Sequence, residues 1–173
     1  MASQSERTST SDRLRVLLEP VLGPCQVENL HQLSGGASRE TWSFTANGRA
    51  LILRRDPPGR PGLRGSMRRE ADAMRACRRA DLAVPEVLAD DDGSVLGTAG
   101  LVMTHVPGET LARRILRDDE FANARAHLVD DLGVFLAGLH AIDPSEVPGL
   151  IDVDTLEQYW NVYETVDYTS PTF

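Results

Sequence analysis

The chain has 173 residues, of which 41% are hydrophobic and 25% charged, and its formal net charge at pH 7 is -8. This length and composition indicate about one globular domain. The acidic balance argues against a general affinity for nucleic acid or an anionic membrane, either of which would require a basic face, so the expected partner is a small molecule or a protein.

The sequence shows no targeting signal and no metal-binding pattern. The first ten residues are polar and lack the apolar stretch of a signal peptide, and no later run approaches the ~18 apolar residues of a membrane span. Cys25 and Cys77 lie outside any CxxC pattern, so neither a disulfide framework nor a zinc site is indicated. We therefore expect a cytoplasmic protein with no metal ligands to assign.

The N-terminal region is predicted to divide at Ser11. Residues 1–10 are rich in Ser and Thr and cannot bury enough apolar surface to offset the entropy of ordering, so they are predicted to form a disordered polar tail. Ser11 is predicted to cap a short helix that carries Leu14 and Leu18 and ends near Gly23.

Three antiparallel strands are predicted next, over residues 27–33, 41–45 and 50–55. The first two are joined by a turn that contains Gly35-Gly36. Asn47-Gly48 is a strong two-residue hairpin signal between the second and the third. The order of these strands along the chain predicts a meander.

One helix and two further strands follow. Ser66 is predicted to cap the helix after a Pro- and Gly-rich loop, and the strands are predicted at residues 87–89 and 101–106. The residues on the inward face of the helix are predicted to be Met67, Ala71, Met74 and Cys77. Five strands with one helix inserted after the third are typical of the N-terminal lobe of a kinase fold.

The pattern becomes helical in the last third of the chain. Apolar residues at steps of three and four predict one long amphipathic helix over residues 121–139, and a final helix is predicted over about 154–166. The predicted domains are therefore a sheet-based lobe over 11–106 and the start of an incomplete helical lobe over 107–173. The expected fold class is α+β.

The glycine-rich turn is the first candidate binding element. A glycine pair between two strands lets the backbone approach a ligand closely and turns peptide N–H groups toward an anion, and flanking serines add hydroxyl donors. A plain hairpin turn is the alternative explanation. The candidate phosphate-binding residues of this turn are Ser34, Gly35, Gly36 and Ser38.

The third strand and the helix after it supply the second candidate element. Strand alternation places Ile52 and Arg54 on one face. Glu70, one turn into the helix, is the natural ion-pair partner that would hold the Arg54 guanidinium on a phosphate group. The alternative is that Arg54 is solvated and that Glu70 merely favours the helix N-terminus. All 18 basic residues are arginines, so a phosphate contact that a lysine might make falls here to a bulkier, planar guanidinium.

Together these segments resemble the aminoglycoside phosphotransferase family, whose members have a protein-kinase-like fold. The likeness is greatest to bacterial phosphotransferases of unassigned substrate and to the kinase-like domains of some acyl-CoA dehydrogenases, and it runs from about Val27 to the last predicted helix. The segments that carry it are Leu33 to Trp42, Leu53 to Arg55, Arg69-Glu70, Leu101 to Met103, Val106 to Gly108 and Leu139 to Pro144.

The resemblance implies a nucleotide, ATP or another nucleoside triphosphate, bound with Mg²⁺, and a hydroxyl group of a small molecule as the phosphoryl acceptor. It implies that Met103, Thr104, His105 and Val106 form the hinge whose backbone reads the adenine edge, and that Ile52 lies against the adenine. His105 is then expected to be a packing or hinge residue and not a catalyst.

Residues for the transfer step are not found in the sequence. The family carries an aspartate that accepts the alcohol proton in a His-Gly-Asp loop, and a second aspartate that holds Mg²⁺. Asp143 comes one residue too late after His140 and indicates a helix end, while Asp152 and Asp154 precede a helix, where aspartates serve as caps.

We therefore expect the ATP-binding portion of a small-molecule phosphotransferase, truncated before its catalytic groups and inactive by itself. Two alternatives remain open. The chain could be a non-catalytic kinase-like module that associates with a partner through an exposed apolar surface of its helices, or an inactive remnant. The predicted surface lies around Phe135, Leu139, Trp160 and Tyr163.

Overall fold

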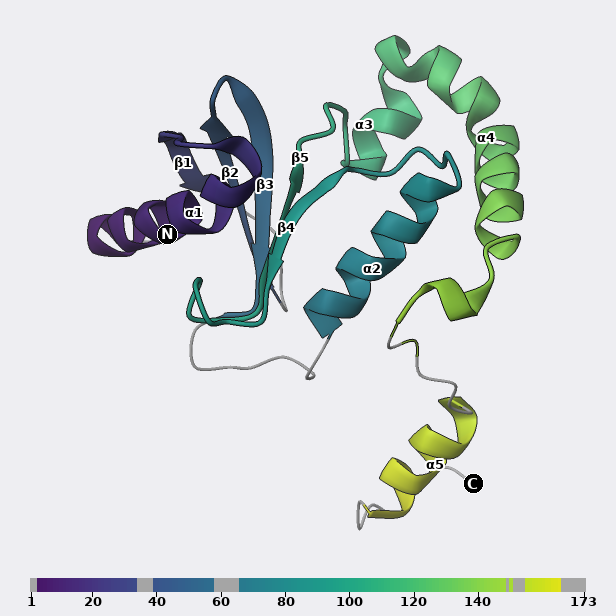
Figure 1. Cartoon of the computed structure of the whole chain (residues 1–173). Helices are drawn as coiled ribbons and strands as arrows, with labels where there is room; N and C mark the ends of the chain where they lie inside the picture. The colour runs from purple at the N-terminus through teal and green to yellow at the C-terminus, as the bar shows by residue number, and fades with distance from the viewer. Residues whose placement is uncertain (1–2, 34–38, 58–65, 149, 151–154, 166–173) are drawn as a thin grey trace.

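The computed structural model describes residues 3–33, 39–57, 66–148, 150 and 155–165. An antiparallel sheet of five strands in the order β1-β2-β3-β5-β4 forms its centre (Figure 1). The strands are β1 (Val27–Gln32), β2 (Glu40–Ala46), β3 (Arg49–Arg55), β4 (Val87–Asp91) and β5 (Gly100–Thr104). The helices are α1 (Gln4–Leu22), α2 (Ser66–Arg79), α3 (Ala112–Arg117), α4 (Ala122–His140) and α5 (Thr155–Thr165), with 3-10 turns η1 (Asp119–Phe121) and η2 (Pro144–Glu146). The predicted α+β class and the order of the strands are confirmed.

The β2–β3 hairpin fixes which residues of β3 share a face. Asn47 and Gly48 both have positive φ, 49° and 74°, as a two-residue turn with the twist of a hairpin requires. On its other side β3 pairs with β5, and there Ile52 pairs with Met103 and Arg54 with Leu101. These four side chains therefore lie on one face of the sheet, because alternate residues of a strand point to the same side.

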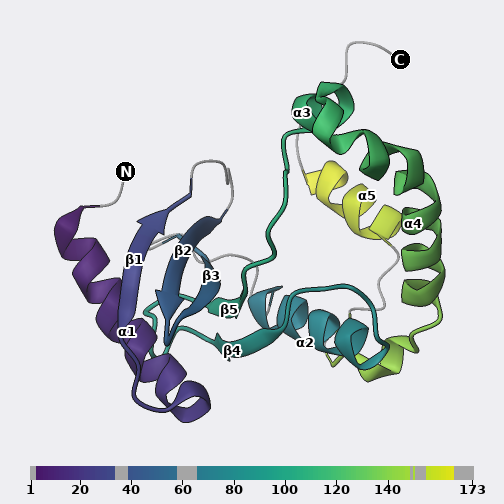
Figure 2. The same cartoon turned by 90° about the horizontal axis from the view of Figure 1, so that it is seen from above.

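Helices α1 and α2 cover opposite faces of the sheet (Figure 2). On the face of α2, the helix buries Met67 and Ala71 against Leu101. Of the predicted inward stripe, Met67, Ala71 and Cys77 are buried, and Met74 is half-buried. The larger apolar cluster lies on the other face, between α1 and the sheet. Its buried members are Leu14, Leu18, Cys25, Trp42, Phe44, Ala46, Leu51, Leu53, Leu96 and Val102.

The predicted disordered tail over residues 1–10 is wrong for residues 4–10. Helix α1 begins at Gln4, and its N-cap is Ser3, whose side chain accepts a hydrogen bond of 3.1 Å from the Glu6 N–H, in place of the predicted cap Ser11. These residues are ordered by polar contacts: Thr10 is buried, and both Glu6 and Thr10 accept hydrogen bonds from the buried Arg55 of β3. Counting apolar residues could not register this stabilisation.

The C-terminal elements follow the predicted helical periodicity. Helices α4 and α5 occupy the predicted ranges within a residue or two, while the short helix α3 was not foreseen. α2 lies between the sheet and α4 (Figures 1 and 2). Within the described residues, no helix is both apolar enough and long enough to cross a membrane. The division into lobes at residues 106 and 107 stays a prediction, although the sheet does end just before it, at Thr104.

Candidate functional site

The predicted ion pair between β3 and α2 is present. A guanidinium nitrogen of Arg54 contacts Glu70 Oε1, and both side chains are partly exposed, Arg54 by 32% and Glu70 by 20%. The pair lies on the face of the sheet that also carries Ile52. Because Arg54 is paired with Glu70, the alternative of a merely solvated Arg54 is wrong. The role of this pair toward a phosphate group stays a prediction.

Glu70 also contacts a second arginine, Arg39, which no sequence pattern marks as a site residue. Arg39 Nη1 lies 2.6 Å from Glu70 Oε2, so each carboxylate oxygen contacts its own guanidinium. Arg39 Nε also lies 3.4 Å from Asp56 Oδ1, and the Asp56 side chain is only 6% exposed. The four residues form what we call the arginine cluster: Arg39, Arg54, Asp56 and Glu70. In sequence, the available signal was that Arg39 directly follows the glycine-rich turn.

Arg55 occupies the opposite face of the sheet and anchors α1. Its side chain is 4% exposed, and Nε donates a hydrogen bond of 2.7 Å to Glu40 Oε2. The Nη groups reach Thr10 Oγ1 at 3.2 Å and Glu6 Oε1 at 3.1 Å, and the guanidinium carbon lies 5.1 Å from the ring centroid of Trp42. Two consecutive arginines thus serve two faces: Arg54 faces α2, and Arg55 fastens β3 to β2 and α1.

The predicted hinge begins within β5: Met103 and Thr104 belong to the strand, and His105 and Val106 follow it. The Thr104 N–H donates to Glu86 O at 2.9 Å, and the His105 N–H donates to Ala50 O at 3.0 Å. Among the residues that the structure describes, none accepts a hydrogen bond from the Val106 N–H. The His105 side chain is exposed, so of its two predicted roles the structure does not show packing, and the hinge role stays a prediction.

An apolar wall adjoins the hinge. Ile52 is buried, and its register partner Met103 is half-buried against the α2 cluster. Both side chains lie on the same face as Arg54, as strand alternation requires. The structure therefore brings the predicted adenine-pocket residue Ile52, Met103 of the predicted hinge and the ion pair to one face of the sheet.

Two groups of predicted residues lie outside the described residues. One is Ser34, Gly35, Gly36 and Ser38, in the connection between β1 and β2; the Leu33 N–H donates to Thr41 O at 2.9 Å and closes the β1–β2 ladder just before it. The other is Asp152 with Asp154. The roles of these residues stay predictions.

Aspartate 143 has the structural role that its sequence context indicates. α4 ends at His140, and Asp143 Oδ1 accepts a hydrogen bond of 2.8 Å from the Ser145 N–H at the start of η2. Hydrogen bonds from Ser145 hold the pKa of the Asp143 carboxyl below its ordinary value. Within the described ranges, no group of three or more His, Cys, Asp or Glu side chains is placed to hold a metal ion.

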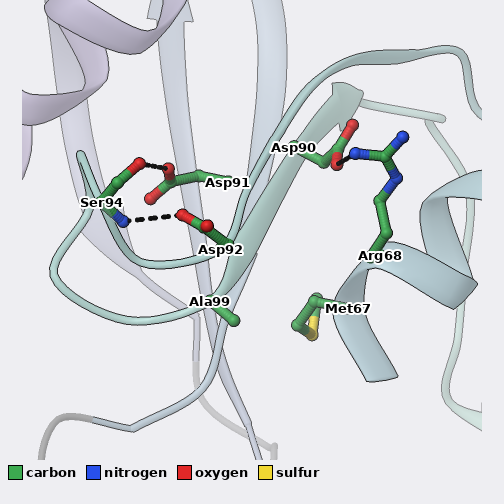
Figure 3. A pocket seen from close by; sticks show the side chains of 7 residues that line it. All are labelled: Met67, Arg68, Asp90, Asp91, Asp92, Ser94 and Ala99. Carbon is green, nitrogen blue, oxygen red and sulfur yellow. Dashed lines mark hydrogen bonds and ion pairs between the residues drawn. The ribbon is translucent and has the colours of Figure 1, made fainter. Parts of the chain in front are cut away.

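A hollow of about 310 Å³ lies between the start of α2 and the β4–β5 connection (Figure 3). Three consecutive aspartates line it, and each already has a partner. Asp90 Oδ1 lies 2.6 Å from Arg75 Nη2. Asp91 accepts a hydrogen bond of 2.9 Å from the Ser94 hydroxyl, and Asp92 accepts one of 3.0 Å from the Ser94 N–H. The carboxylates thus shape the connection between the strands. The full lining is Met67, Arg68, Asp90, Asp91, Asp92, Ser94 and Ala99.

Solved structures share this fold. A candidate aminoglycoside phosphotransferase from Ralstonia eutropha JMP134 is similar with a TM-score of 0.63 and 24% sequence identity, over 94% of this chain and 48% of that one. A candidate fructosamine-3-kinase from Haemophilus somnus 129PT gives a TM-score of 0.56 at 15% identity, over 79% of this chain and 41% of that one. Aminoglycoside phosphotransferase APH(4)-Ia gives 0.53 at 21% identity, over 79% and 40%. The chain thus spans less than half the length of these proteins.

Family membership rests on the sequence comparison. The model of the phosphotransferase enzyme family, APH, matches residues 29–162, which is well over half of the chain. A comparison with curated proteins gave no significant match. The matched range includes the arginine cluster, the hinge and helix α4, and the predicted resemblance to aminoglycoside phosphotransferases is confirmed. The chain therefore belongs to the phosphotransferase enzyme family.

Proposed function

We propose that this chain carries the ATP-binding part of a small-molecule phosphotransferase. The single observation that carries the proposal is the Arg54–Glu70 ion pair, which lies on the same face of the sheet as Ile52 and Met103 in a chain of this family. In such an enzyme the bond between the γ-phosphorus and the bridging oxygen of ATP breaks, and a new P–O bond forms to a hydroxyl of the acceptor. ATP is the proposed nucleotide, with Mg²⁺.

Each part of the site has a distinct proposed task. The adenine lies against Ile52 and Met103, and the Val106 N–H donates a hydrogen bond to its edge. Ser34, Gly35, Gly36 and Ser38 are proposed to bind the phosphates through their N–H and hydroxyl groups. Arg54 binds a phosphate oxygen, and Glu70 keeps its guanidinium oriented by accepting from it.

The proposed activity of this chain by itself is nucleotide binding without phosphoryl transfer. Mg²⁺ would neutralise charge on the β- and γ-phosphates when bound, but none of the residues assigned here is proposed as its ligand. The aspartate that accepts the alcohol proton is likewise not among the assigned residues. The acceptor is therefore given only as a small molecule with a hydroxyl group, and the cell compartment is proposed to be the cytoplasm.

The test is calorimetric titration of the chain with Mg-ATP. Arg54→Ala and Glu70→Ala should each weaken binding by about tenfold or more, since a hydrogen bond to a charged group contributes about 1.5–3 kcal/mol. Arg49→Ala is the matched control, because Arg49 lies on the same strand with its side chain 44% exposed and pairs with Glu86. Absence of Mg-ATP binding by the native chain, or equal binding by all variants, would contradict the proposal.

A second candidate function is a kinase-like interaction module. The observation that favours it is apolar exposure on the C-terminal helices, as predicted for Leu139, Trp160 and Tyr163, which are 36%, 58% and 49% exposed. Phe135 of the same predicted surface is only partly exposed. Sedimentation of the chain with and without Mg-ATP separates the two candidate functions. If the chain associates equally with and without Mg-ATP and does not bind the nucleotide, the result favours the interaction module.

A further inference from the structure

In the arginine cluster, one carboxylate, Glu70, contacts two guanidiniums. Arg54 alone would be enough for the phosphate contact proposed above, so the second arginine, Arg39, needs an explanation. Arg39 enters the cluster from the start of β2 and Arg54 from the end of β3, and the two guanidiniums meet the two oxygens of Glu70. Two like charges around one carboxylate repel each other, so this arrangement has a cost. The buried carboxylate of Asp56, 3.4 Å from Arg39 Nε, offsets part of that repulsion.

The geometry of guanidinium groups indicates what the arrangement can bind. A guanidinium has five N–H donors in a planar fork, and Arg54 spends one nitrogen on Glu70 while a third of its side chain remains exposed. The Arg39 side chain is 24% exposed, so it too reaches solvent. Arg39 contacts Asp56 through Nε and Glu70 through Nη1, so an anion with several oxygens, such as a polyphosphate, would contact the solvent-facing parts of both guanidiniums and not displace Glu70 from between them.

We infer that Arg39 is a second phosphate-binding residue and that Arg39 and Arg54, bridged by Glu70, form a clamp for the polyphosphate of a nucleotide. The inference rests on the proposed function and deepens it: the ligand class becomes nucleoside di- and triphosphates, selected over nucleosides. A chain without lysine has no compact ammonium to place against the phosphates. In its place, the two guanidiniums beside Glu70 supply positive charge for the phosphates, spread over planar groups that are wider than an ammonium.

A purely structural role for Arg39 predicts something different. Its bond to Asp56 fastens the start of β2 to the residue after β3, and this alone could justify the side chain. In that case, removing Arg39 would loosen the whole site and weaken binding of adenosine and of ATP by the same factor. A clamp acts on phosphate only, so the ratio of the two affinities separates the two roles.

The experiment is a titration series with adenosine, AMP, ADP and Mg-ATP against the full chain and its Arg39→Ala, Arg39→Lys, Arg54→Ala and Arg49→Ala variants. We expect Arg39→Ala to weaken ADP and Mg-ATP binding by about tenfold to a hundredfold and adenosine binding by less than about twofold. Arg39→Lys keeps the charge but loses the fork, so it should lie between native and Arg39→Ala. It also serves if Arg39→Ala fails to fold.

The outcomes separate the clamp from the proposed function. If the native chain binds Mg-ATP and Arg54→Ala weakens it, but Arg39→Ala and Arg39→Lys keep the native ratio of ATP to adenosine affinity, the clamp is wrong and the proposed function stands. If the native chain binds no nucleotide, both are wrong. If the ratio of ATP affinity to adenosine affinity falls in the Arg39 variants and stays native in Arg49→Ala, the result supports both the clamp and the proposed function.

Discussion

Replacing Arg55 by alanine tests how α1 is held on the sheet. The side chain is 4% exposed and contacts Glu40, Thr10 and Glu6 at 2.7, 3.2 and 3.1 Å, with the Trp42 ring beside it. Its removal leaves Glu40, itself only 18% exposed, without its cation. Breaking a buried pair in this way costs about 3–5 kcal/mol, and the cation–π contact is a further part of the loss at about 0.5–2 kcal/mol.

Urea unfolding followed by circular dichroism measures this loss. With a slope of about 2 kcal/mol per molar urea, a loss of about 4 kcal/mol lowers the midpoint by about 2 M. Removal of residues 1–10 should reproduce much of the effect, because Glu6 and Thr10 leave with them. Arg49→Ala, at an exposed pair, should change stability by less than about 1 kcal/mol. A loss below about 1 kcal/mol for Arg55→Ala would refute the anchoring of α1 by this residue.

Two further predictions concern acid stability and the hinge. The N–H groups of Leu111 and Thr110, with Arg114, hold the pKa of Glu109 below its ordinary value of 4.5, so this carboxylate stabilises the fold above pH 4.5 and loses that effect as the pH falls through the lowered pKa. The melting temperature should therefore change less between pH 7 and pH 3 in Glu109→Gln than in the native chain. Glu28→Gln, at an exposed glutamate, is the control and should change as much as the native chain. A change in Glu109→Gln as large as the native one would contradict the role of Glu109. Val106→Pro removes the proposed adenine donor and should weaken adenosine and Mg-ATP binding equally, by about tenfold, in titration calorimetry; unchanged binding of both would remove Val106 from the hinge.

Local signals carried most of the fold. Asn47-Gly48 required a two-residue turn, and the register of β2 with β3 followed from it. Strand alternation placed Arg54 on the same face as Ile52. Spacing by three and four residues located α4 because the helical period repeats over nineteen residues. These predictions depend only on residues that are close in sequence, so they can be made from a single sequence.

The contacts that the sequence could not display join distant residues. Arg39 and Glu70 are 31 positions apart, and nothing in the spacing shows that one carboxylate would hold two arginines. Residues 4–10 were assigned to a tail because their composition is polar, yet their partner is Arg55, 45 residues beyond Thr10. Polar networks of this kind depend on tertiary geometry, whereas composition reasoning counts only apolar surface.

The central claim is that the Arg54 guanidinium, tethered by Glu70, faces a bound triphosphate. The most direct measurement is nuclear magnetic resonance of the arginine Nε–Hε groups in the ¹⁵N-labelled chain during titration with Mg-ATP. The account predicts that the Arg54 signal shifts saturably, with the same dissociation constant as in calorimetry, while the Arg49 signal stays in place. An Arg54 signal that does not move in a folded chain at saturating Mg-ATP would contradict it.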